Sequence, residues 1–151
     1  MRIFKYFIVI ISIFFLASCE TGVDTKKKII VPDKFTYLFV TQPHCPSCKK
    51  LEEVMNLEKP KTLLTKYFKI VKLYYGEKLP DGLTPPNGTP TVYFLGADNE
   101  VLVEPMVGEK SEEELIEFLT DSLAEFKNSY HVDLEKKYRE NNETNITHTT
   151  H

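Results

Sequence analysis

Four stretches of the chain carry the apolar pattern of β-strands. Residues 35–41 are almost continuously apolar and rich in aromatic and β-branched side chains, as in a buried strand. Residues 69–75 alternate between lysine and apolar side chains, and residues 91–95 are again nearly all apolar. A tight turn follows at 97–100, and we expect residues 101–103 to return as the antiparallel partner of the preceding strand.

Elsewhere the apolar positions recur at helical spacing. A helix is predicted over residues 45–57, with Pro46 at its first position, where a missing N–H costs nothing. Pro60 begins a second, shorter helical stretch. A third helix is predicted over residues 111–127, because the Ser-x-x-Glu sequence at its start forms a capping box.

The order of these elements is strand, helix, strand, hairpin and helix. It predicts a small α/β domain with a central mixed sheet flanked by helices on both faces. A chain of 151 residues suffices for one such domain but not for two, and we place it at 34–128. Residues 76–88, rich in proline and glycine, are expected to be loop. Residues 129–151 are predicted to be a polar tail, helical at first and disordered from Glu140 onward.

Residues 1–18 have the composition of an export signal. Two positive charges precede an apolar run at 6–16, which is long enough for a signal-peptide core and short for a membrane-spanning helix. The run ends in Leu16-Ala17-Ser18-Cys19, which resembles the lipobox of bacterial lipoproteins. That resemblance implies cleavage before Cys19 and its lipidation, so that residues 19–33 form a lipid-anchored tether. The alternatives are an uncleaved anchor and an ordinary secretory signal.

Charge and cysteine content narrow the classes of function. The formal net charge of −3 lacks the basic excess that phosphate binding requires, so no nucleic-acid partner is expected. The chain has three cysteines, an odd number for an exported protein. If Cys19 carries lipid, Cys45 and Cys48 remain as a C-x-x-C pair, and no structural disulfide framework is left.

The C-x-x-C pair opens the first predicted helix. There the unpaired backbone N–H groups and the helix dipole favour the thiolate of Cys45, while Cys48 lies one turn inward and can close a disulfide with it. Cys45 would attack a substrate disulfide, and Cys48 would resolve the mixed disulfide. This chemistry needs no cofactor beyond the redox-active Cys45–Cys48 disulfide.

Each other use of the Cys45/Cys48 pair requires further ligands, neighbours or loop length. A structural zinc site normally takes four protein ligands, and haem attachment needs a histidine after Cys48, where Lys49 stands. A static disulfide closing so short a loop would constrain little chain. A copper or other soft-metal site formed by His44, Cys45 and Cys48 stays open as an alternative. We predict redox use and no resident metal.

The motifs together are similar to those of the thioredoxin superfamily. The resemblance runs from about Phe35 to Phe126 and rests on Cys-Pro-Ser-Cys at a helix start and Gly88-Thr89-Pro90-Thr91 at a strand entry. It implies a thioredoxin-like fold with a cis peptide bond before Pro90, which would face the cysteines. It also implies that the backbone of Thr89 pairs with an incoming substrate.

Three positions depart from ordinary cytosolic thioredoxins, which carry an aromatic residue before the first cysteine, Gly-Pro between the two, and a buried aspartate in the preceding strand. Those places hold His44, Pro46-Ser47 and Phe39. Without the carboxylate, a water or another side chain would have to deprotonate Cys48. A protonated His44 would stabilise the Cys45 thiolate and raise the reduction potential, unless it is merely an exposed loop residue. A threonine before the cis proline is more like periplasmic disulfide-handling relatives and glutaredoxins.

These patterns predict a periplasm-facing, lipid-anchored thiol–disulfide oxidoreductase of the bacterial envelope that acts on cysteines of exported proteins. A reductase is favoured, and it would need a transmembrane electron donor because the surroundings are oxidising. Cytochrome c maturation, with apocytochrome c as substrate, is one expectation from the family. The rivals are a disulfide isomerase or oxidase, and a thioredoxin-fold lipoprotein that binds copper or zinc without redox turnover.

The tail carries a second, weaker motif. The pattern acidic-x-Asn-x-Thr occurs around Asn142 and again around Asn145, and it resembles the extended acceptor sequence of bacterial periplasmic N-glycosylation. We therefore name both asparagines as candidate glycosylation sites. The alternative is that a tail rich in Asn, Thr and Glu produces such matches by composition.

Overall fold

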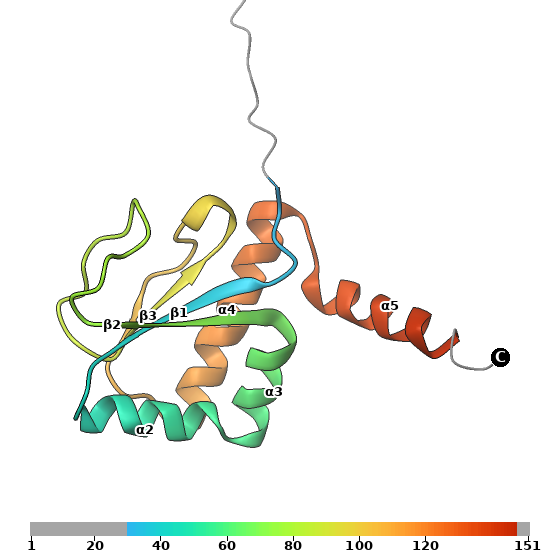
Figure 1. The fold of residues 1–151 in the computed structure, drawn as a ribbon. Helices are drawn as coiled ribbons and strands as arrows, with labels where there is room; N and C mark the ends of the chain where they lie inside the picture. Colours follow the sequence, from blue (N-terminus) through green and yellow to red (C-terminus); the bar gives the residue numbers. More distant parts are fainter. Residues whose placement is uncertain (1–29, 148–151) are drawn as a thin grey trace, which may run out of the picture.

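The computed structural model describes residues 30–147 (Figure 1). The expected signal segment and Cys19 lie outside these residues. Every described helix and strand was predicted except the strand at 106–107 and the short helical turn at 97–99. Apart from the expected strand at 101–103, which does not form, the helices and strands predicted before residue 131 begin and end within three residues of their expected positions. Within the described residues, no helix is long and apolar enough to cross a membrane. The elements are β1 (Phe35–Thr41), α2 (Pro46–Met55), α3 (Glu58–Tyr67), β2 (Phe68–Tyr74), β3 (Thr91–Leu95), η1 (Ala97–Asn99), β4 (Met106–Val107), α4 (Glu112–Tyr130) and α5 (Leu134–Thr147).

The strands form one four-stranded sheet in the order β2-β1-β3-β4. β1 pairs in parallel with β2 and antiparallel with β3, and β3 pairs antiparallel with β4. The expected mixed sheet and α/β class are thus confirmed. β1 lies inside the sheet, and every residue in it except Thr36 is buried, which explains its almost unbroken apolar sequence.

The expectation of helices on both faces is wrong for the described residues. The larger core cluster joins Phe35, Tyr37 and Phe39 of β1 to residues of α2, α3 and α4, so these helices cover one face. The opposite face is a smaller cluster of strand residues packed against Leu79 and Leu83. These two leucines belong to the wide irregular connection between β2 and β3 (Figure 1). Its prolines and glycines oppose a helix there, so a loop covers that face.

The predicted partner strand at 101–103 is also wrong. Val101 makes a single bridge with Leu95, and the paired strand β4 comes later. Regular pairing from that bridge would place Val92 opposite residue 104, but Val92 lies opposite Met106, so the chain accommodates two extra residues. Pro105 lies in this stretch, and a proline has no N–H for the ladder.

The domain boundary at 128 and the disordered tail from Glu140 need correction. α4 continues to Tyr130 and ends at His131, which has left-handed backbone geometry. Leu134 then returns to the core with 6% exposure, and the Tyr138 ring contacts that of Tyr67 on α3 at 5.9 Å. These contacts anchor α5, and a helix once nucleated extends at low cost, so α5 runs on through polar residues to Thr147.

Candidate functional site

The two cysteines stand where β1 gives way to α2. The turn between β1 and α2 passes through His44, whose φ of 57° lies in the left-handed region. Cys45 is the N-cap of α2, and its Sγ accepts a hydrogen bond of 3.1 Å from the backbone N–H of Cys48. Pro46 occupies the first turn as predicted. A helix N-terminus with an unpaired N–H directed at sulfur stabilises a thiolate on Cys45.

Cys45 and Cys48 are joined by a disulfide, with their Cα atoms 5.2 Å apart. Cys45 is half-buried, whereas Cys48 is only 3% exposed and belongs to the main core cluster. The outer sulfur is therefore the one that a substrate can reach. This asymmetry fits the predicted roles of attacking and resolving cysteine.

The segment before β3 brings Thr89 and Pro90 to the disulfide. The peptide bond between them is cis, and Pro90 is buried. The Thr89 hydroxyl donates to Cys45 Sγ at 3.7 Å, and the Thr89 carbonyl oxygen lies 3.8 Å from the same sulfur. Residues that are 44 positions apart in the chain thus meet at one sulfur.

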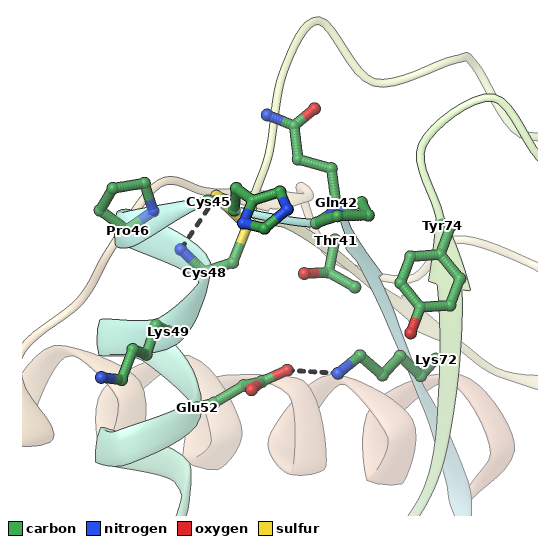
Figure 2. Close-up of a pocket in the computed structure, with 11 residues that line it drawn as sticks. Thr41, Gln42, Cys45, Pro46, Cys48, Lys49, Glu52, Lys72 and Tyr74 are labelled. Carbon is green, nitrogen blue, oxygen red and sulfur yellow. Dashed lines mark hydrogen bonds and ion pairs between the residues drawn. A yellow bond between two sulfur atoms is a disulfide. The ribbon is translucent and has the colours of Figure 1, made fainter.

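A surface cavity of about 570 Å³ opens beside the disulfide (Figure 2). The turn before α2, the first two turns of α2, and β2 all contribute side chains to it. Glu52, Lys72 and Tyr74 are among the lining residues that the sequence did not single out. The available signals were weak: Glu52 follows Cys48 by one helical turn, and Lys72 and Tyr74 are same-face positions of a strand. The lining residues are Thr41, Gln42, Pro43, His44, Cys45, Pro46, Cys48, Lys49, Glu52, Lys72 and Tyr74.

An ion pair crosses this cavity. Lys72 Nζ lies 2.5 Å from Glu52 Oε1, so β2 and α2 are joined below the disulfide. The hydrogen bond to Glu52 raises the pKa of Lys72 above its ordinary value, which keeps this lysine charged. The pair is only partly exposed, with 46% of the Lys72 side chain and 39% of the Glu52 side chain accessible.

The remaining predicted residues are His44, the two tail asparagines and Cys19. His44 is exposed and lines the cavity beside Cys45. This position is compatible with both predicted roles, an electrostatic one toward the Cys45 thiolate and that of an exposed loop residue. Within residues 30–147, no three His, Cys, Asp or Glu side chains are arranged to hold a metal ion. Asn142 and Asn145 lie on the backbone of α5. Cys19 lies outside the described residues.

No protein-family model matches this chain, and no curated protein is similar to it in sequence. Solved structures do match its fold. The periplasmic thioredoxin SoxS from Paracoccus pantotrophus, in its reduced form, is 21% identical with a TM-score of 0.51, and the match covers 61% of this chain and 98% of SoxS. The predicted thioredoxin-like fold is thereby confirmed.

Two further structures match more loosely. A disulphide isomerase from Xylella fastidiosa is 21% identical with a TM-score of 0.45, covering 59% of this chain and 78% of that one. A thioredoxin from Thermus thermophilus is 19% identical with a TM-score of 0.46, covering 58% of this chain and 72% of that one.

Proposed function

We propose that this chain is a thiol–disulfide oxidoreductase of the bacterial envelope that reduces disulfides in exported proteins. The observation that carries the proposal is the setting of Cys45. Its sulfur stands at a helix N-terminus, accepts hydrogen bonds from the Cys48 N–H and the Thr89 hydroxyl, and is linked to a nearly inaccessible Cys48. The helix N-terminus and the two hydrogen bonds stabilise a thiolate on Cys45, and burial protects Cys48 as the resolving thiol.

The reaction takes place in two exchanges. In the reduced protein, the Cys45 thiolate attacks one sulfur of a substrate disulfide, and a substrate thiolate leaves. The Cys48 thiolate then attacks Cys45 Sγ, closing the Cys45–Cys48 bond and releasing the second substrate thiolate. The substrate gains two electrons and the cysteine pair loses two, so the protein must be reduced again before the next turnover.

The envelope location and the direction of electron flow are part of the proposal. They are supported by the charged and apolar start of the chain, by the Leu-Ala-Ser-Cys sequence ending at Cys19, and by the periplasmic origin of SoxS, which shares the fold. Lipidated Cys19 would hold the domain at the membrane. A transmembrane electron donor would then reduce Cys45–Cys48 against the oxidising surroundings, and exported cysteine proteins such as apocytochrome c would be substrates.

Trapping tests the proposal directly. The Cys48→Ser variant should accumulate mixed disulfides through Cys45 in envelope extracts, and the Cys45→Ser/Cys48→Ser variant is the matched control that should accumulate none. The reduction potential measured against glutathione should lie below about −200 mV, toward the range of thioredoxins. Absence of mixed disulfides would refute the redox role, and a potential near that of a strong oxidase, about −120 mV, would reverse its direction. Stoichiometric copper or zinc lost on Cys45→Ser would instead support the metal-binding rival.

A further inference from the structure

Cys48 is buried, and its thiol must lose a proton before it can act. Only 3% of the residue is exposed, and burial among apolar groups favours the neutral thiol over the thiolate. The neighbouring strand offers no help, because Phe39 of β1 lies in the same apolar cluster as Cys48. The proton acceptor for Cys48 must therefore come from another element.

The cavity beside the disulfide supplies few groups that could accept this proton. Lys49, Lys72 and Tyr74 also line the cavity, but an ammonium group has no lone pair to accept a proton and a phenol is a very weak base, so side chains of these types cannot serve. His44 belongs to the turn ahead of α2 and directly precedes Cys45, which carries the outer sulfur. Among the described residues that line the cavity, Glu52 is the one carboxylate.

Glu52 is also the group best placed on Cys48's own helix. It follows Cys48 by four residues, so the two side chains project from the same side of α2. Figure 2 shows Glu52 one turn below Cys48, with its carboxylate directed across the cavity at Lys72. The ion pair to β2 restrains the carboxylate inside the cavity instead of leaving it free in solvent.

We infer that Glu52 accepts the proton of the Cys48 thiol when the mixed disulfide is resolved, and that Lys72 is the positioning residue that holds Glu52 for this step. The inference rests on the proposed function and deepens it. The cavity is large enough for water, so the proton can pass from Cys48 to Glu52 through a bridging water. The Cys48 thiolate then forms the Cys45–Cys48 bond, the Cys45–substrate bond breaks, and the departing substrate thiolate takes up a proton from protonated Glu52 or from solvent.

The test separates the two exchanges in time. The reduced full chain in detergent is mixed with a disulfide-bonded model peptide, and acid-quenched samples are analysed by mass spectrometry. One rate reports formation of the mixed disulfide by Cys45, and the other reports its resolution by Cys48. Glu52→Gln should slow resolution at pH 7 by about 100-fold, the lower end of what a general base contributes, and leave formation unchanged. The loss should shrink as the pH rises above the ordinary pKa of a free thiol, about 8.5, because Cys48 then begins to ionise without help.

The matched control is Glu53→Gln, one position along the same helix, whose carboxylate pairs with Lys49 and lies outside the cavity lining. It should resolve the mixed disulfide at the wild-type rate. Glu52→Asp should recover part of the lost rate, and Lys72→Met should lose part of it without changing formation. A purely structural role for the ion pair would slow both rates together.

The outcomes separate this inference from the function on which it rests. If the wild type forms no mixed disulfide, the proposed function and the inference both fall. If the wild type forms and resolves it, and Glu52→Gln resolves it equally fast across the pH range, the inference alone is overturned. An equal loss in Glu53→Gln would likewise overturn it, because the effect would then be one of helix charge.

Discussion

Lys72 on β2 lies directly opposite Phe39 on β1 in the parallel register, and its ammonium nitrogen stands 5.9 Å from the centre of the Phe39 ring. The two side chains share one face of the sheet, yet Phe39 is 2% exposed while 46% of the Lys72 side chain is accessible. Phe39 therefore forms an apolar floor beneath the site, and the charged ammonium group of Lys72 lies between this ring and solvent. The two contributions to stability should be very unequal.

We expect Phe39→Ala to lower the free energy of unfolding by about 3–5 kcal/mol, because it leaves a cavity in the main core. Lys72→Met is the comparison, since it keeps the stem of the side chain and removes an exposed charge. It should cost about 1 kcal/mol or less. Urea unfolding of both variants measures the difference, and similar costs would show that the ion pair, not the apolar floor, holds these strands.

The hydroxyl of Thr89 should stabilise the thiolate of Cys45. It donates to that sulfur in the structure, and hydrogen bonds to charged groups contribute about 1.5–3 kcal/mol. Because the contact is long, we take the lower end and expect Thr89→Val to reduce the thiolate fraction of Cys45 about tenfold below neutral pH. Ultraviolet absorbance of the thiolate, followed against pH in a Cys48→Ser background, measures it.

Thr91→Val is the matched control for this experiment. It makes the same exchange of hydroxyl for methyl two residues along, but the Thr91 hydroxyl donates to the carbonyl of Gly88 and not to sulfur. We expect it to leave the thiolate titration of Cys45 unchanged. A shift of equal size in both variants would attribute the effect to the loop and not to the hydrogen bond.

Prediction from sequence succeeded where the signal was local. The strand Phe35–Thr41 was predicted without error, because its residues belong to apolar clusters on both faces of the sheet and its sequence is correspondingly apolar on both faces. The spacing of Cys45 and Cys48 and the proline at the helix start indicate a redox-active pair from the sequence alone.

Prediction failed where the answer depended on contacts between distant segments. Glu52 and Lys72 are 20 residues apart and look like ordinary surface charges until α2 and β2 are placed side by side. The second helical layer was expected from the fold class, although the proline-rich connection after β2 opposes a helix. Leu134 was assigned to the tail because a single apolar residue in a polar segment carries no periodic signal.

Leu134 should prove to be part of the domain when it is truncated. It is 6% exposed and packs with the main core, so Leu134→Ala should lower the free energy of unfolding by about 2–3 kcal/mol. Leu57→Ala, at a residue that is 42% exposed, is the comparison and should cost about 1 kcal/mol or less. Urea unfolding measures both. If Leu134→Ala costs no more than Leu57→Ala, then α5 does not contribute to the core in solution.

The start of α4 should make stability depend on acid pH through Glu114. Its carboxylate accepts a hydrogen bond of 2.7 Å from the backbone N–H of Ser111, while the Ser111 hydroxyl accepts one from the N–H of Glu114, as the predicted capping box requires. The hydrogen bonds from Ser111, the backbone one foremost, lower the pKa of Glu114 below its ordinary value of 4.5. The ionised form is thus favoured in the folded state.

A lowered folded-state pKa means that this contribution is fully present above pH 4.5 and is lost as the pH falls through the lower folded value. Glu114→Gln should therefore be less stable than the wild type at pH 7, and the difference should close once the pH has fallen below the folded-state pKa of Glu114, where both side chains are neutral. Urea unfolding at several pH values measures it. Glu113→Gln, in the same first turn but outside the capping box, should show a smaller difference that reflects the helix dipole alone. A Glu114→Gln difference that stays constant down to pH 2 would mean that the amide loses packing or geometry, and not that the ionised carboxylate caps the helix.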